Sequence, residues 1–84
     1  MKDREFEIGN VVRHFKAEID NDGRYYYVIR DFAEHTETGE KMVVYQALYD
    51  EYKTYVRPYN MFVEKVDKDK YPFIEQEYRF ERIG

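Results

Sequence analysis

Apolar and polar side chains alternate along five short segments of the chain, which is the pattern of β-strands with two unlike faces. These segments are residues 8–15, 24–35, 42–49, 53–58 and 62–66. The second of them breaks strict alternation near Arg30 or Asp31, so we predict a β-bulge at that point. The pattern as a whole predicts an all-β chain of five strands.

Turn-forming residues separate the predicted strands. Residues 17–23 (AEIDNDG) and the loop containing Gly39 are rich in short polar side chains and glycine, which favour tight turns between antiparallel strands. Residues 50–52 predict a further turn, and residues 58–61 predict one helical turn before the last strand. Short strands joined in this way are typical of a small, strongly bent barrel, because closure of the sheet removes its exposed edges.

The segment MVVYQALY, residues 42–49, is apolar on both of its faces. One parity carries Met42, Val44 and Leu48, and the other carries Val43, Tyr45, Ala47 and Tyr49. One face of a barrel strand fills the interior, and we expect Val44, Leu48 and Phe62 to lie mostly in this core. The other face then needs a second cover, which would be the C-terminal tail, a long loop, a second copy of the chain or a ligand.

The last part of the chain is charged but contains regularly placed aromatic residues. We expect this tail, residues 67–84, to dock onto a core formed by residues 8–66, with a short helix over residues 73–78. The docking side chains would be Tyr71, Phe73, Ile74, Tyr78 and Phe80. Near the other end, Phe6 would pack against the same core. We therefore treat residues 1–84 as a single domain.

Composition narrows the class of protein. A chain of 84 residues supports one modest core, and cysteine is absent, so neither disulfides nor thiolate metal sites reinforce it. No apolar run approaches the ~20 residues of a membrane span, and the start, MKDREFEIG, has acidic residues where a signal peptide needs an apolar segment. These observations predict a cytoplasmic protein that does not interact with membranes.

Tyrosine is unusually frequent. The chain holds 10 Tyr and 6 Phe but no Trp, and so many phenol groups cannot all be buried, since each hydroxyl needs a partner or water. Some tyrosines must therefore line a surface or a cleft. The net charge of −4 repels phosphate backbones, so nucleic acid is not an expected partner, with single-stranded nucleic acid a minor alternative on aromatic grounds.

A set of polar and aromatic residues around the middle strands forms the candidate ligand-binding site. Its members are His35, Glu37, Tyr45, Tyr49, Tyr55 and Arg57. Phenol rings suit a groove for a peptide, a base or a methylated amine, and the planar fork of Arg57 suits a carboxylate or phosphate. The alternatives are that the tyrosines form ordinary core or a dimer contact, and that Arg57 pairs internally with Glu34 or Glu37.

Enzymatic chemistry has few candidate residues in this chain. Serine and cysteine are both absent, which excludes the familiar nucleophilic triads and thiol chemistry. His14, His35 and Glu37 would bring two imidazoles and a carboxylate together only if the fold converged on them, as in some iron sites. The simpler interpretation is that His35 hydrogen-bonds within a hairpin turn. We expect no catalytic residues, no metal and no cofactor.

Several ordered pieces of the sequence, spread from about Gly9 to Phe80, resemble one known family. They are Arg13 to Lys16, His35 to Thr38, Val43 to Tyr49, Val56 to Pro58, Met61-Phe62 and Arg79-Phe80. This set is similar to the bacterial domain-of-unknown-function family 1653. The resemblance implies a small SH3-like barrel and implies no activity. The family typically has Trp where this chain has Tyr55.

The sequence thus predicts an all-β, five-stranded SH3-like barrel with one helical turn before the last strand and a docked C-terminal tail. Its predicted function is that of a non-enzymatic binding module, with a small polar ligand or peptide as its unknown partner. The alternative from another class is a structural or assembly protein that uses the aromatic face for homodimerisation. A small metal-dependent enzyme is a third interpretation.

Overall fold

Five antiparallel strands form one sheet in the computed structural model, which describes residues 5–20 and 23–83. The strands are β1 (Val11–His14), β2 (Tyr26–Glu34), β3 (Lys41–Ala47), β4 (Thr54–Pro58) and β5 (Phe80–Ile83). Two single helical turns interrupt them, the 3-10 helix η2 (Phe15–Glu18) and α1 (Tyr59–Phe62). The expectation of an all-β domain with a helical turn before the last strand is confirmed.

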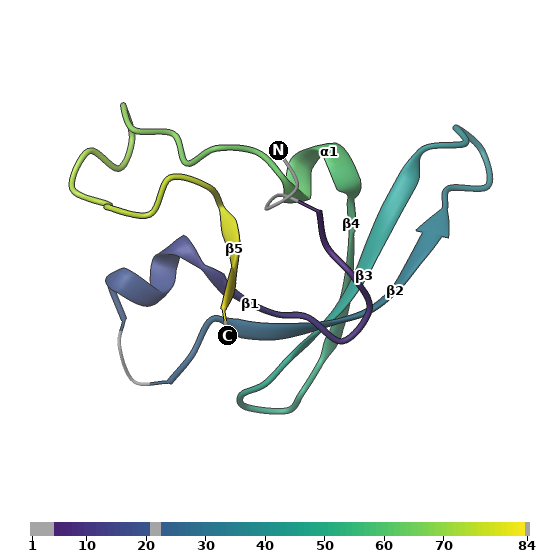
Figure 1. Ribbon diagram of the computed structural model, residues 1–84, viewed down its shortest axis with the longest axis horizontal. Helices are drawn as coiled ribbons and strands as arrows, with labels where there is room; N and C mark the ends of the chain where they lie inside the picture. Colours follow the sequence, from purple (N-terminus) through teal and green to yellow (C-terminus); the bar gives the residue numbers. More distant parts are fainter. Residues whose placement is uncertain (1–4, 21–22, 84) are drawn as a thin grey trace.

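The strands lie in the order β4-β3-β2-β1-β5, and the sheet is strongly bent (Figure 1). The two outermost strands nevertheless approach each other through side chains. The guanidinium carbon of Arg57 on β4 lies 5.5 Å from the ring centre of Phe80 on β5. The same Phe80 ring lies 5.5 Å from the ring of Tyr45 on β3. The sheet therefore curls so that β5 closes over β3 and β4.

The long hairpin of β2 and β3 has the predicted irregularity. The register shifts between Ile29 and Asp31, which leaves Arg30 as the extra residue of a bulge. The hairpin turn is closed by the Gly39 N–H, which donates to the His35 carbonyl at 2.8 Å, and Gly39 has a φ of 75°. Glycine suits that conformation because it has no Cβ. Two residues of the other predicted turn, Asn21 and Asp22, lie outside the described residues.

The inward face of β3 is the opposite of the one expected. Val43, Tyr45 and Ala47 are buried, whereas Val44 is only half-buried and Leu48 is 41% exposed. The prediction that Val44 and Leu48 lie in the core is therefore wrong. The reason is the cross-strand register, because the Tyr45 parity continues the buried face of β2. The prediction for Phe62 is confirmed, since its side chain is fully buried.

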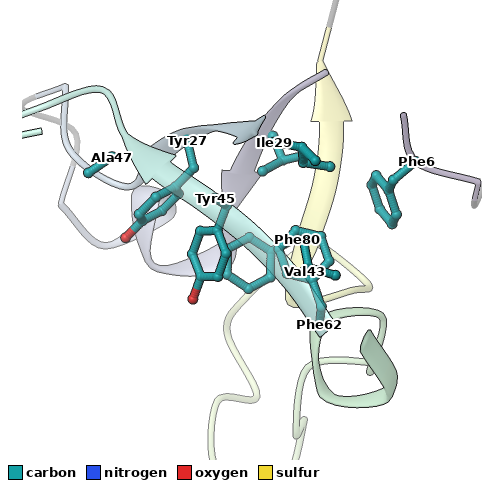
Figure 2. Packing of buried hydrophobic residues seen from close by; sticks show 9 residues of the cluster. Phe6, Tyr27, Ile29, Val43, Tyr45, Ala47, Phe62 and Phe80 are labelled. Atoms are coloured by element: carbon teal, nitrogen blue, oxygen red, sulfur yellow. The ribbon is translucent and has the colours of Figure 1, made fainter. Parts of the chain in front are cut away.

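Aromatic rings fill most of the main core (Figure 2). Phe62 of α1 and Phe80 of β5 stack face to face, with ring centres 4.2 Å apart and planes 7° apart. Phe6 meets Phe62 edge to face at 5.3 Å, so the expected packing of the N-terminal lead-in is confirmed. A second, smaller cluster joins Phe15 of η2 to Val66 and Ile74 from the segment between α1 and β5.

The fifth strand comes from a different part of the chain than predicted. Residues 62–66 form no strand, and only an isolated bridge links Lys65 to Tyr78. Instead β5, Phe80–Ile83, pairs antiparallel with β1. The place beside β1 is taken by the segment that buries Phe80 in the core. Phe62 is buried as the last residue of α1, so the segment that follows it does not pair with β1. The predicted helix over residues 73–78 is also absent.

Polar side chains fix the tail to β1 where the helix was expected. The Glu18 carboxylate accepts the backbone N–H groups of Glu75 and Gln76, at 2.8 and 2.6 Å. The buried Gln76 side chain accepts from Arg13 Nε and donates to the carbonyls of Arg13 and Tyr78, each at 2.8 to 2.9 Å. We call this set of hydrogen bonds the Gln76 clamp. It replaces helical hydrogen bonding with contacts to a distant strand.

The docking residues predicted for the tail divide by exposure. Ile74 and Phe80 are buried, and Tyr71 and Tyr78 are half-buried, so these four expectations are confirmed. Phe73 is 67% exposed, so the expectation that it docks is wrong.

Candidate functional site

Four tyrosines from three segments meet at one end of the core. Tyr27 of β2 lies 5.3 Å from Tyr45 and 5.6 Å from Tyr49, measured between ring centres, and Tyr45 lies 5.8 Å from Tyr55 of β4. The hydroxyl oxygens of Tyr27 and Tyr49 are 2.7 Å apart, a short hydrogen bond. In Figure 2 the hydroxyl groups of Tyr27 and Tyr45 point to the same side. We call these four residues the tyrosine cluster.

Two phenols of the tyrosine cluster are shifted away from ionisation. Burial, and then the hydrogen bond to Tyr49, raise the pKa of Tyr27 above its ordinary value. Burial also raises the pKa of Tyr45, and the neighbouring Arg57 guanidinium opposes this rise. These phenols therefore remain neutral hydrogen-bonding groups at physiological pH.

A hollow of about 520 Å³ opens beside this cluster, and we call it the tyrosine hollow. Its lining residues are Ala47, Tyr49, Asp50, Glu51, Lys53 and Tyr55. The β3–β4 turn shapes it, because the Tyr52 N–H donates to the Tyr49 carbonyl at 3.0 Å. Tyr49 and Tyr55 provide aromatic walls, while charged side chains of both signs stand around them.

Arg57 follows Tyr55 by two residues on β4, so both side chains face the same side of the strand. Its guanidinium lies over the Phe80 ring and next to the Tyr45 hydroxyl. Among the described residues, its alternative ion pair with Glu34 or Glu37 is not formed. Arg57 therefore borders the tyrosine cluster and presents charge to a second hollow.

This second hollow, of about 270 Å³, is lined mainly by cationic and aromatic side chains, and we call it the cationic hollow. Its lining residues are His14, Phe15, Lys16, Arg57, Asp67, Lys70, Tyr71 and Arg79. Burial, and then the charges of Arg57, Lys16 and Arg79, lower the pKa of His14 to about 4. The imidazole is therefore neutral at pH 7 and lies in a positive local potential.

Sequence reasoning found Arg57 but missed the other cations of the cationic hollow. Lys16 comes from η2, and Lys70 and Arg79 come from the tail between α1 and β5. These residues are far apart in the chain and belong to no common motif. Lys16 and Arg79 each lie in a sequence piece that resembles the family, but only the docking of the tail beside β1 and β4 brings them together with Lys70.

His35 and Glu37 lie in the exposed turn of the β2–β3 hairpin, which extends away from the other strands (Figure 1). The Nδ1 atom of His35 accepts the backbone N–H groups of Glu37 and Thr38, at 3.1 and 3.4 Å. The expected role of His35 in a hairpin turn is thereby confirmed. Neither residue lines the tyrosine hollow or the cationic hollow.

His14 lies against the core and contacts Phe80 edge to face at 4.8 Å. Within residues 5–20 and 23–83, no three His, Asp or Glu side chains approach closely enough to hold a metal ion. His14, His35 and Glu37 are therefore not brought to one point.

Within residues 5–20 and 23–83, no helix is long and apolar enough to cross a membrane.

The architecture defines a class of protein: a small, all-β domain with an aromatic core and two adjoining hollows. Residues 10–82 match the model of a family described as "Protein of unknown function (DUF1653)". Because the match spans most of the 84 residues, the chain belongs to this family, as the sequence resemblance implied. No curated protein matches the chain. No solved structure matches it either.

Proposed function

We propose that this domain is a non-enzymatic binding module that takes a small polar ligand, or a polar side chain of a peptide, in the tyrosine hollow. Arg57 lies behind this site, next to the Tyr45 hydroxyl, and does not line the hollow itself. The observation that carries the proposal is the pairing of a hollow of about 520 Å³ with two aromatic walls, Tyr49 and Tyr55. Small-molecule sites in proteins are concave, have roughly this size (about 300–1,000 Å³), and combine aromatic walls with a few polar groups.

The polar groups around this hollow suit a ligand that is itself polar. Asp50 and Glu51 supply carboxylates, and Lys53 supplies an ammonium group that lies 3.8 Å from Glu51. An exposed ion pair of this kind contributes little to stability, so its groups reorient at low cost toward a ligand. The tyrosine hydroxyls add neutral donors and acceptors.

The walls of the tyrosine hollow are held in place before any ligand arrives. The hydroxyl bond from Tyr27 fixes the Tyr49 ring, and the Tyr45 ring packs against Tyr55. A side chain that is already ordered loses less conformational entropy on binding, which favours affinity. Tyr27 and Tyr45 therefore support the site from behind.

The proposal is tested by titrating the purified protein with panels of peptides, nucleotides and metal ions, following tyrosine signals by NMR. We expect a binding compound to shift the signals of Tyr49 and Tyr55 and to be weakened at least tenfold by Tyr55→Ala, which removes one wall. Tyr52→Ala is the matched control. Tyr52 lies in the β3–β4 turn just before Tyr55, is 58% exposed and does not line the hollow.

Two results would reject this function. One is a panel in which every compound leaves the Tyr49 and Tyr55 signals unmoved. The other is a ligand whose affinity falls equally in the Tyr52 and Tyr55 variants, since such a ligand would bind to the exposed turn rather than to the hollow.

Homodimerisation through the aromatic face is the second candidate. Tyr45 is only 5% exposed within a single chain, so most of this face is already filled, whereas Tyr55 is 42% exposed and remains available to a partner. Sedimentation separates the two candidates. A dimer that persists at low micromolar concentration and dissociates in Tyr55→Ala would favour assembly over ligand binding.

A further inference from the structure

Four cationic side chains converge on the cationic hollow from separate parts of the fold. Lys16 comes from η2, Arg57 from β4, and Lys70 and Arg79 from the tail. The whole chain carries a net charge of −4, so this concentration of positive charge runs against its composition. Like charges gathered in one place raise the free energy of the folded state unless something neutralises them.

Two carboxylates offset part of this charge, Asp67 in the lining of the hollow and Glu64 beside Arg79, so two of the four positive charges remain in excess. Oδ1 of Asp67 accepts the backbone N–H groups of Asp69 and Lys70, at 3.1 and 3.3 Å, and so caps its own turn. Glu64 lies 3.5 Å from Nε of Arg79 and offsets that one cation. In the part of the chain that the structure describes, Lys16 and Arg57 form no ion pair with a carboxylate.

His14 adds a neutral donor to the same hollow. Its Nδ1 atom accepts the Lys16 N–H at 3.1 Å, so the proton of the neutral ring sits on Nε2. The ring is fixed by stacking on Phe15, with ring centres 4.5 Å apart. Burial, and after it the charges of Arg57, Lys16 and Arg79, lower the pKa of His14, so the ring itself adds no charge to the hollow at pH 7.

We propose that the cationic hollow is a second binding site and that it takes the phosphate group of a small molecule. A tetrahedral dianion meets cations from several directions, whereas a planar carboxylate is satisfied by one guanidinium fork. The volume of about 270 Å³ holds a phosphate group with a small substituent. The negative net charge and the compact shape of the hollow disfavour a nucleic-acid strand.

This site goes beyond the function proposed above and does not depend on it. The two hollows have no lining residue in common, because all four cations, Arg57 included, line only the cationic hollow, whereas Tyr49 and Tyr55 line only the tyrosine hollow. Loss of one site therefore leaves the other measurable.

The test is an NMR titration of the intact chain with inorganic phosphate and, in a separate arm, with glucose 6-phosphate, at constant ionic strength set by sodium chloride. We expect the His14 ring signals to shift saturably. At saturation the His14 pKa should rise by about one unit, because a bound anion favours the imidazolium form. The signals of His35, in the distant hairpin turn, should not move.

Matched variants locate the site. Lys70→Gln and Lys16→Gln should each weaken phosphate binding by about tenfold, because each removes one charge-assisted hydrogen bond. Lys53→Gln is the control, since Lys53 lines the tyrosine hollow instead, and it should leave phosphate affinity unchanged. Circular dichroism establishes that each variant is folded. Tyr55→Ala should also leave phosphate binding intact, which separates this site from the proposed function.

Several outcomes would overturn the proposal. The first is a His14 response to sodium chloride alone that matches the response to phosphate, which would indicate screening. The second is equal weakening by Lys53→Gln and Lys70→Gln. The third is a titration with succinate, a dicarboxylate, that shows tighter binding than either phosphate compound. The last is a short single-stranded oligonucleotide that binds more tightly than phosphate with a steep salt dependence.

Discussion

The sheet core and the tail of residues 63–79 are held together in different ways. The core is a set of packed rings, with Phe62 and Phe80 stacked at its centre. The tail has little regular structure and depends on the Gln76 clamp and on Lys68, whose ammonium group donates to the carbonyls of Ile74 and Gln76. Apolar packing is spread over many weak contacts, whereas a hydrogen bond joins two particular groups, so the loss of one side chain from the clamp removes several specific contacts at once.

Because of this difference, the two hollows depend on different parts of the fold for their stability. The tyrosine hollow is built on β3 and β4 and inherits the rigidity of the core. The cationic hollow needs Lys70 and Arg79 from the tail, so it depends on the Gln76 clamp and on the small apolar cluster of Phe15, Val66 and Ile74 that hold the tail in place. Damage to the core should therefore unfold the whole domain, whereas damage to the clamp should first loosen the cationic hollow.

The largest expected effect is in the core. Phe62→Ala removes a fully buried ring that stacks on Phe80, and it should lower the free energy of unfolding by about 3–5 kcal/mol. Urea denaturation measures the change, with Phe62→Leu as a milder variant if the alanine form does not fold. Phe73→Ala is the tail control, since its ring is exposed, and should change stability by about 0.5 kcal/mol or less. Similar losses in Phe73→Ala and Phe62→Leu would contradict the contrast.

The second-largest expected effect is in the Gln76 clamp. Gln76→Ala removes a buried side chain that donates to the carbonyls of Arg13 and Tyr78 and accepts from Arg13 Nε, which should cost about 2–3 kcal/mol. Hydrogen exchange should show faster exchange in residues 63–79 before the strands open. Glu75→Ala is the neighbouring control, because its side chain is exposed and its backbone N–H still reaches Glu18. If exchange quickened uniformly across the sheet and tail, the two regions would not be separable.

Acidic pH should lower the free energy of unfolding by a smaller amount, through His14, which lies between the core and the tail. The pKa of His14 is about 4 in the folded chain and 6.5 as an ordinary value, so between these pH values the unfolded chain binds a proton that the folded chain does not. This contribution to stability is fully present above about pH 6.5 and is lost as the pH falls toward 4. The loss should be about 2 kcal/mol, less than the full equivalent of the pKa difference, because the ring is partly exposed and solvent screens it.

The measurement is urea denaturation of the wild type and of His14→Gln at pH 7.5, 5.5 and 4.5. Carboxylates titrate in both proteins, so the relevant quantity is the difference between their pH profiles. That difference should shrink as the pH falls. Parallel profiles would mean that His14 takes up its proton equally in the folded and unfolded chains.

The smallest expected effect lies in the tyrosine cluster. Tyr27→Phe removes the hydroxyl bonded to Tyr49 but keeps the ring, so it should cost about 1 kcal/mol. The half-buried Tyr49 hydroxyl can then turn to water. Tyr52→Phe changes an exposed position in the same β3–β4 turn as Tyr49 and should leave the free energy of unfolding unchanged. A loss in Tyr27→Phe as large as that in Phe62→Ala would show that hydrogen bonding outweighs ring packing in this core.

The strands β1 to β4 could be predicted because their information is local. Alternation of side chains, the bulge at Arg30 and the turn at Gly39 each depend on neighbours in the sequence. The alternation of FVEKV over residues 62–66 was misleading for the same reason. It satisfies a local rule, but the position beside β1 goes to the segment whose Phe80 fits the core.

The candidate site was only partly predictable. The sequence predicted that Tyr45, Tyr49, Tyr55 and Arg57 lie close together, and the fold places the three tyrosines in the tyrosine cluster and Arg57 beside it. It did not indicate that His35 and Glu37 are separated from them by the projecting hairpin. Nor did it indicate Lys16, Lys70 or Arg79, because their proximity depends on how the tail docks.

The sequence by itself determined the all-β class, the first four strands and the excess of phenol rings, since alternation, turn residues and composition act locally. Tertiary structure alone decided which face of β3 is buried, which segment closes the sheet and which cations share a hollow. These outcomes depend on the free energy of burying Phe62 and Phe80 together and of satisfying the buried polar groups around Gln76. Such a sum over distant parts of the chain is not contained in any single segment.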